Sequence, residues 1–217
     1  MSNGNFDFNL FIRESKDILV NPKNAFSSMK TSGGLAEPLI KVVIYGAIAG
    51  ALAFIWSFLN VGSMSGGLFG GSYGIMVFVS YIIGAVIALF IGGLILLLIS
   101  SFCSGNTDYE ANLRVISSVM VIMPVAAFFG FTGIINPYLG LLIILFIHLF
   151  SIWLLYNGIV EALKAKPESA RIIMYILAAL VVVFMIVSMS IQKRAGELIN
   201  DEGNGIQKEQ VDDQEKE

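Results

Sequence analysis

The chain has 217 residues, of which 56% are hydrophobic and only 13% are charged. Soluble domains average about 25% charged residues, so this composition indicates one membrane domain that is solvated partly by lipid. The formal net charge is −3 and the sequence shows no strongly basic segment, so nucleic acid is not an expected partner. The single cysteine, Cys103, excludes an intramolecular disulfide and a metal site built from cysteines.

Three long stretches contain no Asp, Glu, Lys or Arg: residues 42–107, 115–160 and 172–192. Mostly apolar runs of 18 or more residues without charge are typical of transmembrane helices. We therefore predict an all-α integral membrane protein, with a bundle of five transmembrane helices in a membrane domain over 39–191. The spans are expected at about 39–59, 75–102, 108–131, 138–159 and 167–191.

Residues 1–38 are expected to form a cytosolic, interfacial segment. Over residues 6–20, a helix would place Phe8, Phe11, Ile12 and Leu19 on one stripe, with most charges elsewhere on the wheel. Such an amphipathic helix suits the membrane interface. A second short helix should begin at Pro22 and end near residue 30. The first apolar run comes too late for a secretory signal, so none is expected.

Two glycine patterns lie in and after the first span. Gly46 and Gly50 are four residues apart, which allows close helix contact, either with a neighbouring span or with a second copy of the chain. The stretch 60–74 is rich in glycine and serine but lacks the lysine of a phosphate-binding loop. We expect this stretch to be a flexible outer loop.

A polar island interrupts the apolar body, because Asp108, Glu110 and Arg114 are the only charges between Lys41 and Glu161. Thr107 and Glu110 fit a capping box for the third span, and the four-residue spacing lets Glu110 pair with Arg114.

The same island, taken as Asp108, Tyr109, Glu110 and Arg114, could instead be a docking patch on the inner face. Further along the third span, Pro124 predicts a kink, either static or acting as a hinge.

His148 and Asn157 are candidates for an intramembrane polar site in the fourth span. His148 could relay a proton or bind a ligand, or it could be a neutral imidazole bonded across helices. No acid or second histidine shares the membrane interior, which disfavours a charge-coupled transporter. No catalytic constellation is present, so we expect neither an enzyme nor a cofactor or metal. The alternative function is a channel or permease for a small neutral or lipidic solute. Its lining would be Ser80, Ser117, Ser118, His148 and Asn157.

Lysine and arginine counts predict the orientation. With the N-terminus inside, nine of these residues lie on the inner side and none in the two outer loops. Against this orientation, Lys193 and Arg194 lie close to the membrane on the outer side. We therefore expect a multi-pass cell-membrane protein with a cytoplasmic N-terminus and an outer C-terminus. Residues 197–217 hold eight acids against two lysines, and the acidic tail 192–217 is expected to be disordered.

Several short motifs occur in an order that resembles the Yip-domain family, five-span membrane proteins named for interaction with Ypt/Rab GTPases. They are residues 21–26 (NPKNAF), 109–115 (YEANLRV), Pro124, Trp153, 161–165 (EALKA) and Ala170. The resemblance extends over about residues 10–191. It implies a helical bundle with a cytosolic N-terminus and, in eukaryotic members, roles in vesicle trafficking and membrane shaping through partner proteins.

The N-terminal segment is short and lacks the acidic and tyrosine-bearing motifs of the trafficking branch, so the chain looks like the compact prokaryotic form. A Rab-type GTPase is accordingly a doubtful partner. The function expected from the whole pattern is that of a non-enzymatic membrane scaffold. It would contact the lipid bilayer and other membrane or cytosolic proteins through its inner face.

Overall fold

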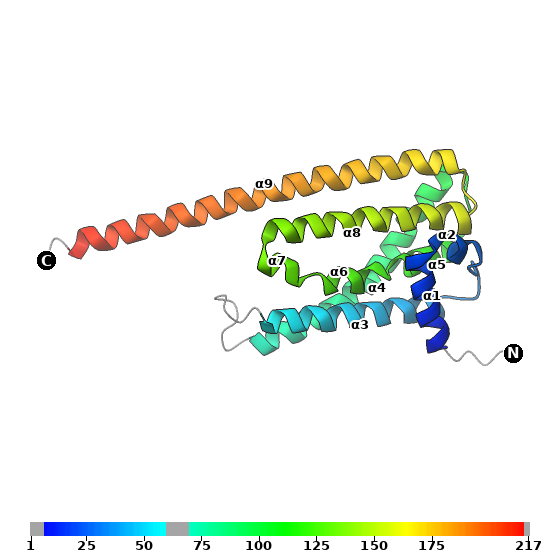
Figure 1. Ribbon diagram of the computed structural model, residues 1–217, viewed down its shortest axis with the longest axis horizontal. Coiled ribbons are helices and arrows are strands. Elements are labelled where there is room, and N and C mark those ends of the chain that lie inside the picture. The colour runs from blue at the N-terminus through cyan, green and yellow to red at the C-terminus, as the bar shows by residue number, and fades with distance from the viewer. Residues whose placement is uncertain (1–6, 60–69, 215–217) are drawn as a thin grey trace. The chain divides into compact units, whose positions relative to one another are not determined.

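The computed structural model describes residues 7–59 and 70–214, and within these ranges it contains helices and no strand (Figure 1). The elements are α1 (Phe8–Val20), α2 (Pro22–Ser27), α3 (Ala36–Leu59), α4 (Gly70–Phe102), α5 (Tyr109–Val119), α6 (Ile122–Phe128), α7 (Phe131–Ile135), α8 (Pro137–Asn157), the π-helical turn η1 (Gly158–Ala162) and α9 (Pro167–Gln214). Most of the expected outer loop over 60–74 lies outside the described residues.

Five stretches are long and apolar enough to cross a membrane. They are Ala36–Ser57, Gly74–Phe102, Tyr109–Gly133, Pro137–Ala162 and Pro167–Ile191. The predicted all-α architecture with five membrane-crossing helices is therefore confirmed. The chain divides into two units, Met1–Ala178 and Ala179–Glu217, and the packing described below belongs to the first unit.

The C-terminal segment differs from the expectation of disorder. Residues 192–214 continue α9 as a helix. No proline follows Pro167 in this helix, and the Glu, Lys and Gln residues of the tail are good helix formers. Low hydrophobicity prevents such a segment from building a core, but it does not prevent helix formation.

Two glycines of α3 let this helix pack closely against α4. A Cβ on Gly46 would lie 3.0 Å from the Cβ of Ala85, and a Cβ on Gly50 would lie 2.9 Å from the carbonyl oxygen of Phe78. The close helix contact that Gly46 and Gly50 allow is thus made between two helices of the same chain. Because α4 covers this face, Gly46 and Gly50 do not offer a surface for self-association, contrary to the possibility raised from the sequence.

The third span is interrupted before its proline. α5 ends at Val119 and α6 begins at Ile122, with a turn between them. Pro124 has no N–H to donate to the carbonyl of Met120, and that carbonyl instead accepts the N–H of Met123 at 2.9 Å. The span therefore consists of separate short helices.

The amphipathic helix α1 is present, and Asp7 caps it by accepting the N–H groups of Asn9 and Leu10. Its buried residues are Phe11 and Ile18, whereas Phe8 is exposed. The buried stripe is therefore rotated from the predicted one.

The reason for this rotation is that α1 packs on protein. The ring of Phe11 lies 5.1 Å from that of Tyr45 on α3, and Ser15 Oγ lies 2.7 Å from Tyr45 Oη. A second anchor is Phe26 on α2, which is fully buried. Its ring lies beside Gly158 at the start of η1.

Candidate functional site

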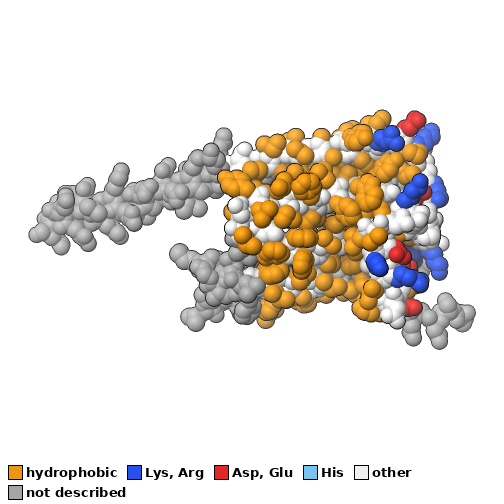
Figure 2. All heavy atoms as spheres, viewed as in Figure 1, with side chains coloured by type: hydrophobic (Ala, Val, Ile, Leu, Met, Phe, Trp, Pro, Cys, Tyr) orange, Lys and Arg blue, Asp and Glu red, His pale blue; other side chains and the backbone are white. Residues whose placement is uncertain are grey.

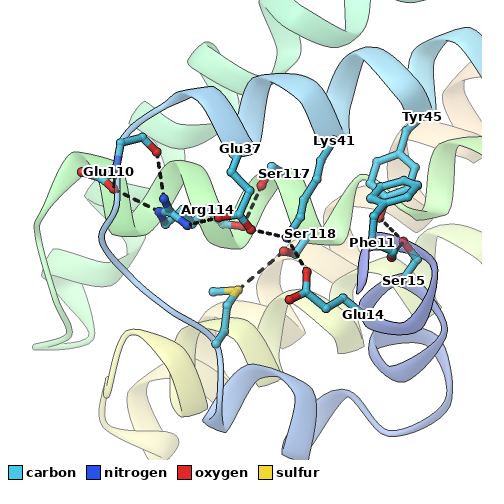
Figure 3. A network of polar contacts seen from close by, with 12 residues as sticks. Phe11, Glu14, Ser15, Glu37, Lys41, Tyr45, Glu110, Arg114, Ser117 and Ser118 are labelled. Carbon is cyan, nitrogen blue, oxygen red and sulfur yellow. Dashed lines mark hydrogen bonds and ion pairs between the residues drawn. The ribbon is translucent and has the colours of Figure 1, made fainter. Parts of the chain in front are cut away.

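Arg114 on α5 is a buried cation, with only 4% of the residue exposed. Its Nε donates to Glu110 Oε1 at 3.0 Å, its Nη1 to Glu37 Oε2 at 2.9 Å, and its Nη2 to the carbonyl of Gly34 at 2.8 Å. Figure 3 shows the guanidinium enclosed by these acceptors. The side chain thus joins α5, the start of α3 and the loop between α2 and α3.

The loop before α3 needs glycine to lie on this guanidinium. Gly33 and Gly34 have φ angles of +136° and +89°, a region that favours glycine. A Cβ on Gly33 would lie 2.9 Å from Nη2 of Arg114. The N–H of Gly34 also donates to Glu110 Oε1 at 2.7 Å. Gly33 and Gly34 are therefore part of the site.

Lys41 on α3 is a second buried cation. Its Nζ lies 2.8 Å from Glu14 Oε2 on α1 and 2.8 Å from Glu37 Oε1, one turn earlier on α3. Because Glu37 contacts both cations, a continuous series of ion pairs runs from α1 to α5 (Figure 3). We call Glu14, Glu37, Lys41, Glu110 and Arg114 the ion-pair network.

A cavity of about 350 Å³ lies beside the ion-pair network. Three acids and three bases line it: Glu14, Asp17, Glu37, Lys30, Lys41 and Arg114. Its other lining residues are Leu10, Ile18, Ala25, Ser28, Met29, Pro38, Ser117 and Ser118. The cavity therefore combines charges of both signs with apolar walls from α1 and α2.

Charged side chains gather at one end of the face shown in Figure 2, beside a broad apolar belt. We call the region of the first unit that carries α1, α2 and the starts of α3 and α5 the charged end. Glu37, Lys41, Glu110 and Arg114 lie near the starts of two membrane-crossing stretches. The ion-pair network thus occupies the depth at which a bilayer would change from hydrocarbon to water.

The polar island is arranged differently from the predicted capping box. Asp108, not Thr107, is the N-cap of α5 and accepts the N–H of Ala111 at 2.9 Å. The carboxylate of Glu110 is engaged by Arg114 and Gly34, so it does not reach back to the cap. The predicted box is therefore wrong, whereas the predicted Glu110–Arg114 pair is confirmed.

The four residues considered for a docking patch do not share one exposed surface. Asp108 is exposed, Tyr109 and Glu110 are half-buried, and Arg114 is buried. The hydroxyl of Tyr109 donates to the carbonyl of Phe90 on α4 at 3.1 Å. Three of the four side chains thus hold α5 against its neighbours, and Asp108 caps it.

The residues proposed to line a channel are not brought together either. His148 is exposed, and its Nδ1 lies 2.7 Å from the carbonyl of Ile144 on the same helix. Asn157 is buried and donates to the carbonyl of Trp153 at 2.8 Å. Ser80 is also exposed, whereas Ser117 and Ser118 are buried beside the cavity at the charged end.

The roles of Glu14, Glu37 and the two loop glycines are not predicted from the sequence, where Lys41 counts only as an inner-side charge. One signal was available, because Glu37 and Lys41 are four residues apart at the start of a span and can pair on one helix face. No local pattern links Arg114 to α3, since that pair spans 77 residues.

Cys103 is buried in the turn after α4. Desolvation raises the pKa of its thiol, which favours the neutral, unreactive form. Among the residues that the structure describes, no group of three or more His, Cys, Asp or Glu side chains is placed to hold a metal ion.

The chain matches the model of the Yip1 domain over residues 16–189. No curated protein and no solved structure matches it. The matched range contains Glu37, Lys41, Glu110 and Arg114, and only Glu14 of the ion-pair network precedes it. The family match covers most of the chain and agrees with the resemblance seen in the sequence: the chain belongs to the Yip1 domain family.

Proposed function

We propose that this protein is a non-enzymatic membrane scaffold that acts in membrane organisation through contacts made by its charged end. The observation that carries the proposal is the ion-pair network, which fastens α1 and the Gly33–Gly34 loop onto the membrane-crossing helices. It gives the charged end a defined shape. A surface of fixed shape beside the bilayer suits a scaffold for proteins or lipids.

The chemistry of the ion-pair network favours a structural role. All three donor nitrogens of Arg114 point to acceptors within the chain, and Lys41 lies between two carboxylates. Groups held in this way are poorly placed to exchange protons with a substrate.

The proposed orientation places the charged end in the cytoplasm, in the cell membrane, with the C-terminus outside. The positive-inside rule supports this orientation, since Arg13, Lys16, Lys23, Lys30 and Lys41 all precede or begin the first span.

Site-specific photo-crosslinking in cells, combined with imaging of membrane shape, tests the scaffold role. A photo-reactive residue replaces Phe8 or Lys16, which are exposed on α1, or Leu142, which is exposed on the fourth span. We expect reproducible protein adducts from α1 and only lipid adducts from Leu142. We also expect the variant Glu14→Lys, which repels Lys41, to lose those adducts and to change membrane morphology. Unchanged adducts and unchanged morphology in this variant would overturn the proposal.

A further inference from the structure

The two buried cations that line the cavity have carboxylate partners within the chain, so no ligand is needed to balance their charge. Lys41 and Arg114 line it, but their nitrogen atoms already contact Glu14, Glu37 and Glu110. The lining acids and bases are equal in number, and Glu110, which pairs with Arg114, adds a further negative charge. A simple anion therefore gains no net attraction here, in contrast to an Arg or Lys cluster built for phosphate alone.

Two lining residues remain available, and they carry opposite charges. Within the part of the chain that the structure describes, no hydrogen bond or ion pair involves the side chain of Asp17 on α1 or that of Lys30 after α2. Both side chains are exposed and both line the cavity. The cavity thus offers one free carboxylate and one free ammonium to an incoming group.

A third lining group has a poor partner. Ser118 is buried, with 1% of the residue exposed, and its hydroxyl donates to the sulfur of Met29 at 3.5 Å (Figure 3). A thioether sulfur is a weak acceptor, so this buried donor would gain from an oxygen acceptor entering the cavity. A phosphate oxygen is such an acceptor.

The apolar lining residues determine what else a ligand of this cavity must carry. Leu10, Ile18, Ala25, Met29 and Pro38 give the cavity an apolar side, and the charged end lies at the expected depth of the membrane boundary. A ligand that carries a phosphate, a cation and an apolar continuation matches all of these features. Phosphatidylethanolamine has this combination, and its primary ammonium can donate hydrogen bonds to a carboxylate.

We infer that the cavity binds an ethanolamine phosphate group. Its phosphate contacts Lys30 and Ser118, and its ammonium contacts Asp17. The inference rests on the proposed function only for the source of the group, which a scaffold at the membrane boundary would take from phosphatidylethanolamine. A soluble source with the same chemistry is glycerophosphoethanolamine.

Native mass spectrometry of the full chain in detergent, with lipids of matched acyl chains, tests this site. We expect phosphatidylethanolamine to be retained more strongly than phosphatidylglycerol, which lacks the cation, and phosphatidylcholine, whose quaternary ammonium donates no hydrogen bond. Asp17→Asn and Lys30→Gln should each weaken its retention about tenfold, the loss expected for one charge-assisted hydrogen bond. Ser118→Ala should weaken it less. Lys16→Gln and Glu168→Gln change exposed residues that do not line the cavity, and they should leave retention unchanged.

Glycerophosphoethanolamine, added as a competitor, identifies the source. Displacement of the lipid at equal headgroup concentration assigns the site to the soluble group, and no displacement assigns it to the lipid; either result agrees with the shared chemistry. Equal retention of the three lipids would overturn the inference, as would unchanged retention in both Asp17→Asn and Lys30→Gln. Loss of lipid selectivity with intact protein adducts from α1 would leave the scaffold proposal standing.

Discussion

Arg114 on α5 and Glu37 at the start of α3 are separated by 77 residues, and a 2.9 Å ion pair joins them. The same carboxylate contacts Lys41, so one acidic side chain connects two buried cations. Since Lys41 also contacts Glu14 on α1, this series of ion pairs links the N-terminal helix to the third span. At the charged end, α1, α3 and α5 are therefore joined by one series of ion pairs.

Replacement of Arg114 tests the importance of this centre for stability. Arg114→Met removes the shared partner of Glu37 and Glu110, and removal of one member of a buried ion pair is strongly destabilising. Because both acids are partly exposed, we expect a loss near the lower end of the usual range, about 3 kcal/mol. The measurement is the free energy of unfolding in detergent micelles.

Arg171→Met is the matched control, because Arg171 is exposed and outside the ion-pair network; it should change stability by no more than about 0.5 kcal/mol. Adding Glu37→Gln and Glu110→Gln to Arg114→Met should recover part of the loss, because the uncompensated charges are then absent. Equal stability of Arg114→Met and the natural chain would show that the ion-pair network does not hold the charged end together.

The glycines of α3 give a second prediction. Gly50→Ala would place a Cβ 2.9 Å from the backbone oxygen of Phe78, so α3 and α4 must separate, at a cost of about 1–3 kcal/mol. Gly84→Ala is the control, because a Cβ there meets nothing within 4 Å, and it should be neutral or stabilising by up to about 1 kcal/mol. Equal unfolding free energies for the two variants would contradict the packing of α3 on α4.

The features that can be predicted from the sequence are those that depend on interactions local along the chain. Charge-free apolar runs identified the five spans, because each span must be solvated by hydrocarbon along its length. The pairing of Glu110 with Arg114 followed from helix geometry. The cap of α5 was misassigned by one residue, since Thr107 and Asp108 are both good caps and tertiary contacts of Glu110 decided between them.

The rest of the site depends on contacts that no periodicity encodes. The Gly33–Gly34 loop contacts Arg114 and Glu110, which lie about 80 residues later in the sequence. A contact between such distant residues leaves no repeating pattern in the sequence near the loop. Likewise, a helical wheel shows that α1 has an apolar side, but it does not show whether that side contacts lipid or protein. Tyr45 selects Phe11 and Ser15 as the contacting residues.

The attachment of α1 can be measured by amide hydrogen exchange. Glu14→Gln removes the charge that Lys41 contacts at 2.8 Å, while the Ser15–Tyr45 contact remains. We expect exchange in residues 8–20 to accelerate about tenfold, as for loss of one hydrogen bond to a charged group. Lys16→Gln, on an exposed side of the same helix, should have no effect. Identical protection in both variants would mean that the ion pair does not fasten α1.

The proposed orientation predicts which positions an impermeant thiol reagent reaches on intact cells. In a Cys103→Ala background, single cysteines replace Tyr138, an exposed residue after the α7–α8 turn, or Ser101, an exposed residue near the charged end. We expect Tyr138→Cys to be labelled from outside and Ser101→Cys only after the membrane is permeabilised. The reverse pattern would invert the topology.

Cys103 provides a probe of the turn that joins the second and third spans. Its carbonyl accepts the N–H of Lys166 at 2.9 Å, and the N–H of Asn106 donates to the carbonyl of Leu163 at 2.7 Å. A Cβ on Gly105 would lie 2.8 Å from that of Ala165. The turn thus packs against residues 163–166, the connector before α9, and it keeps the thiol fully buried.

Because burial also raises the pKa of the Cys103 thiol, little reactive thiolate should form at neutral pH. We expect maleimide to label the folded chain at least about tenfold more slowly than the chain unfolded in detergent. The comparison variant is Cys103→Ala with Ser101→Cys, which moves the thiol two residues away to an exposed position and should react quickly in the folded state. Equally fast labelling of Cys103 and of the introduced cysteine would show that the turn opens, and that its contacts with the connector do not persist in solution.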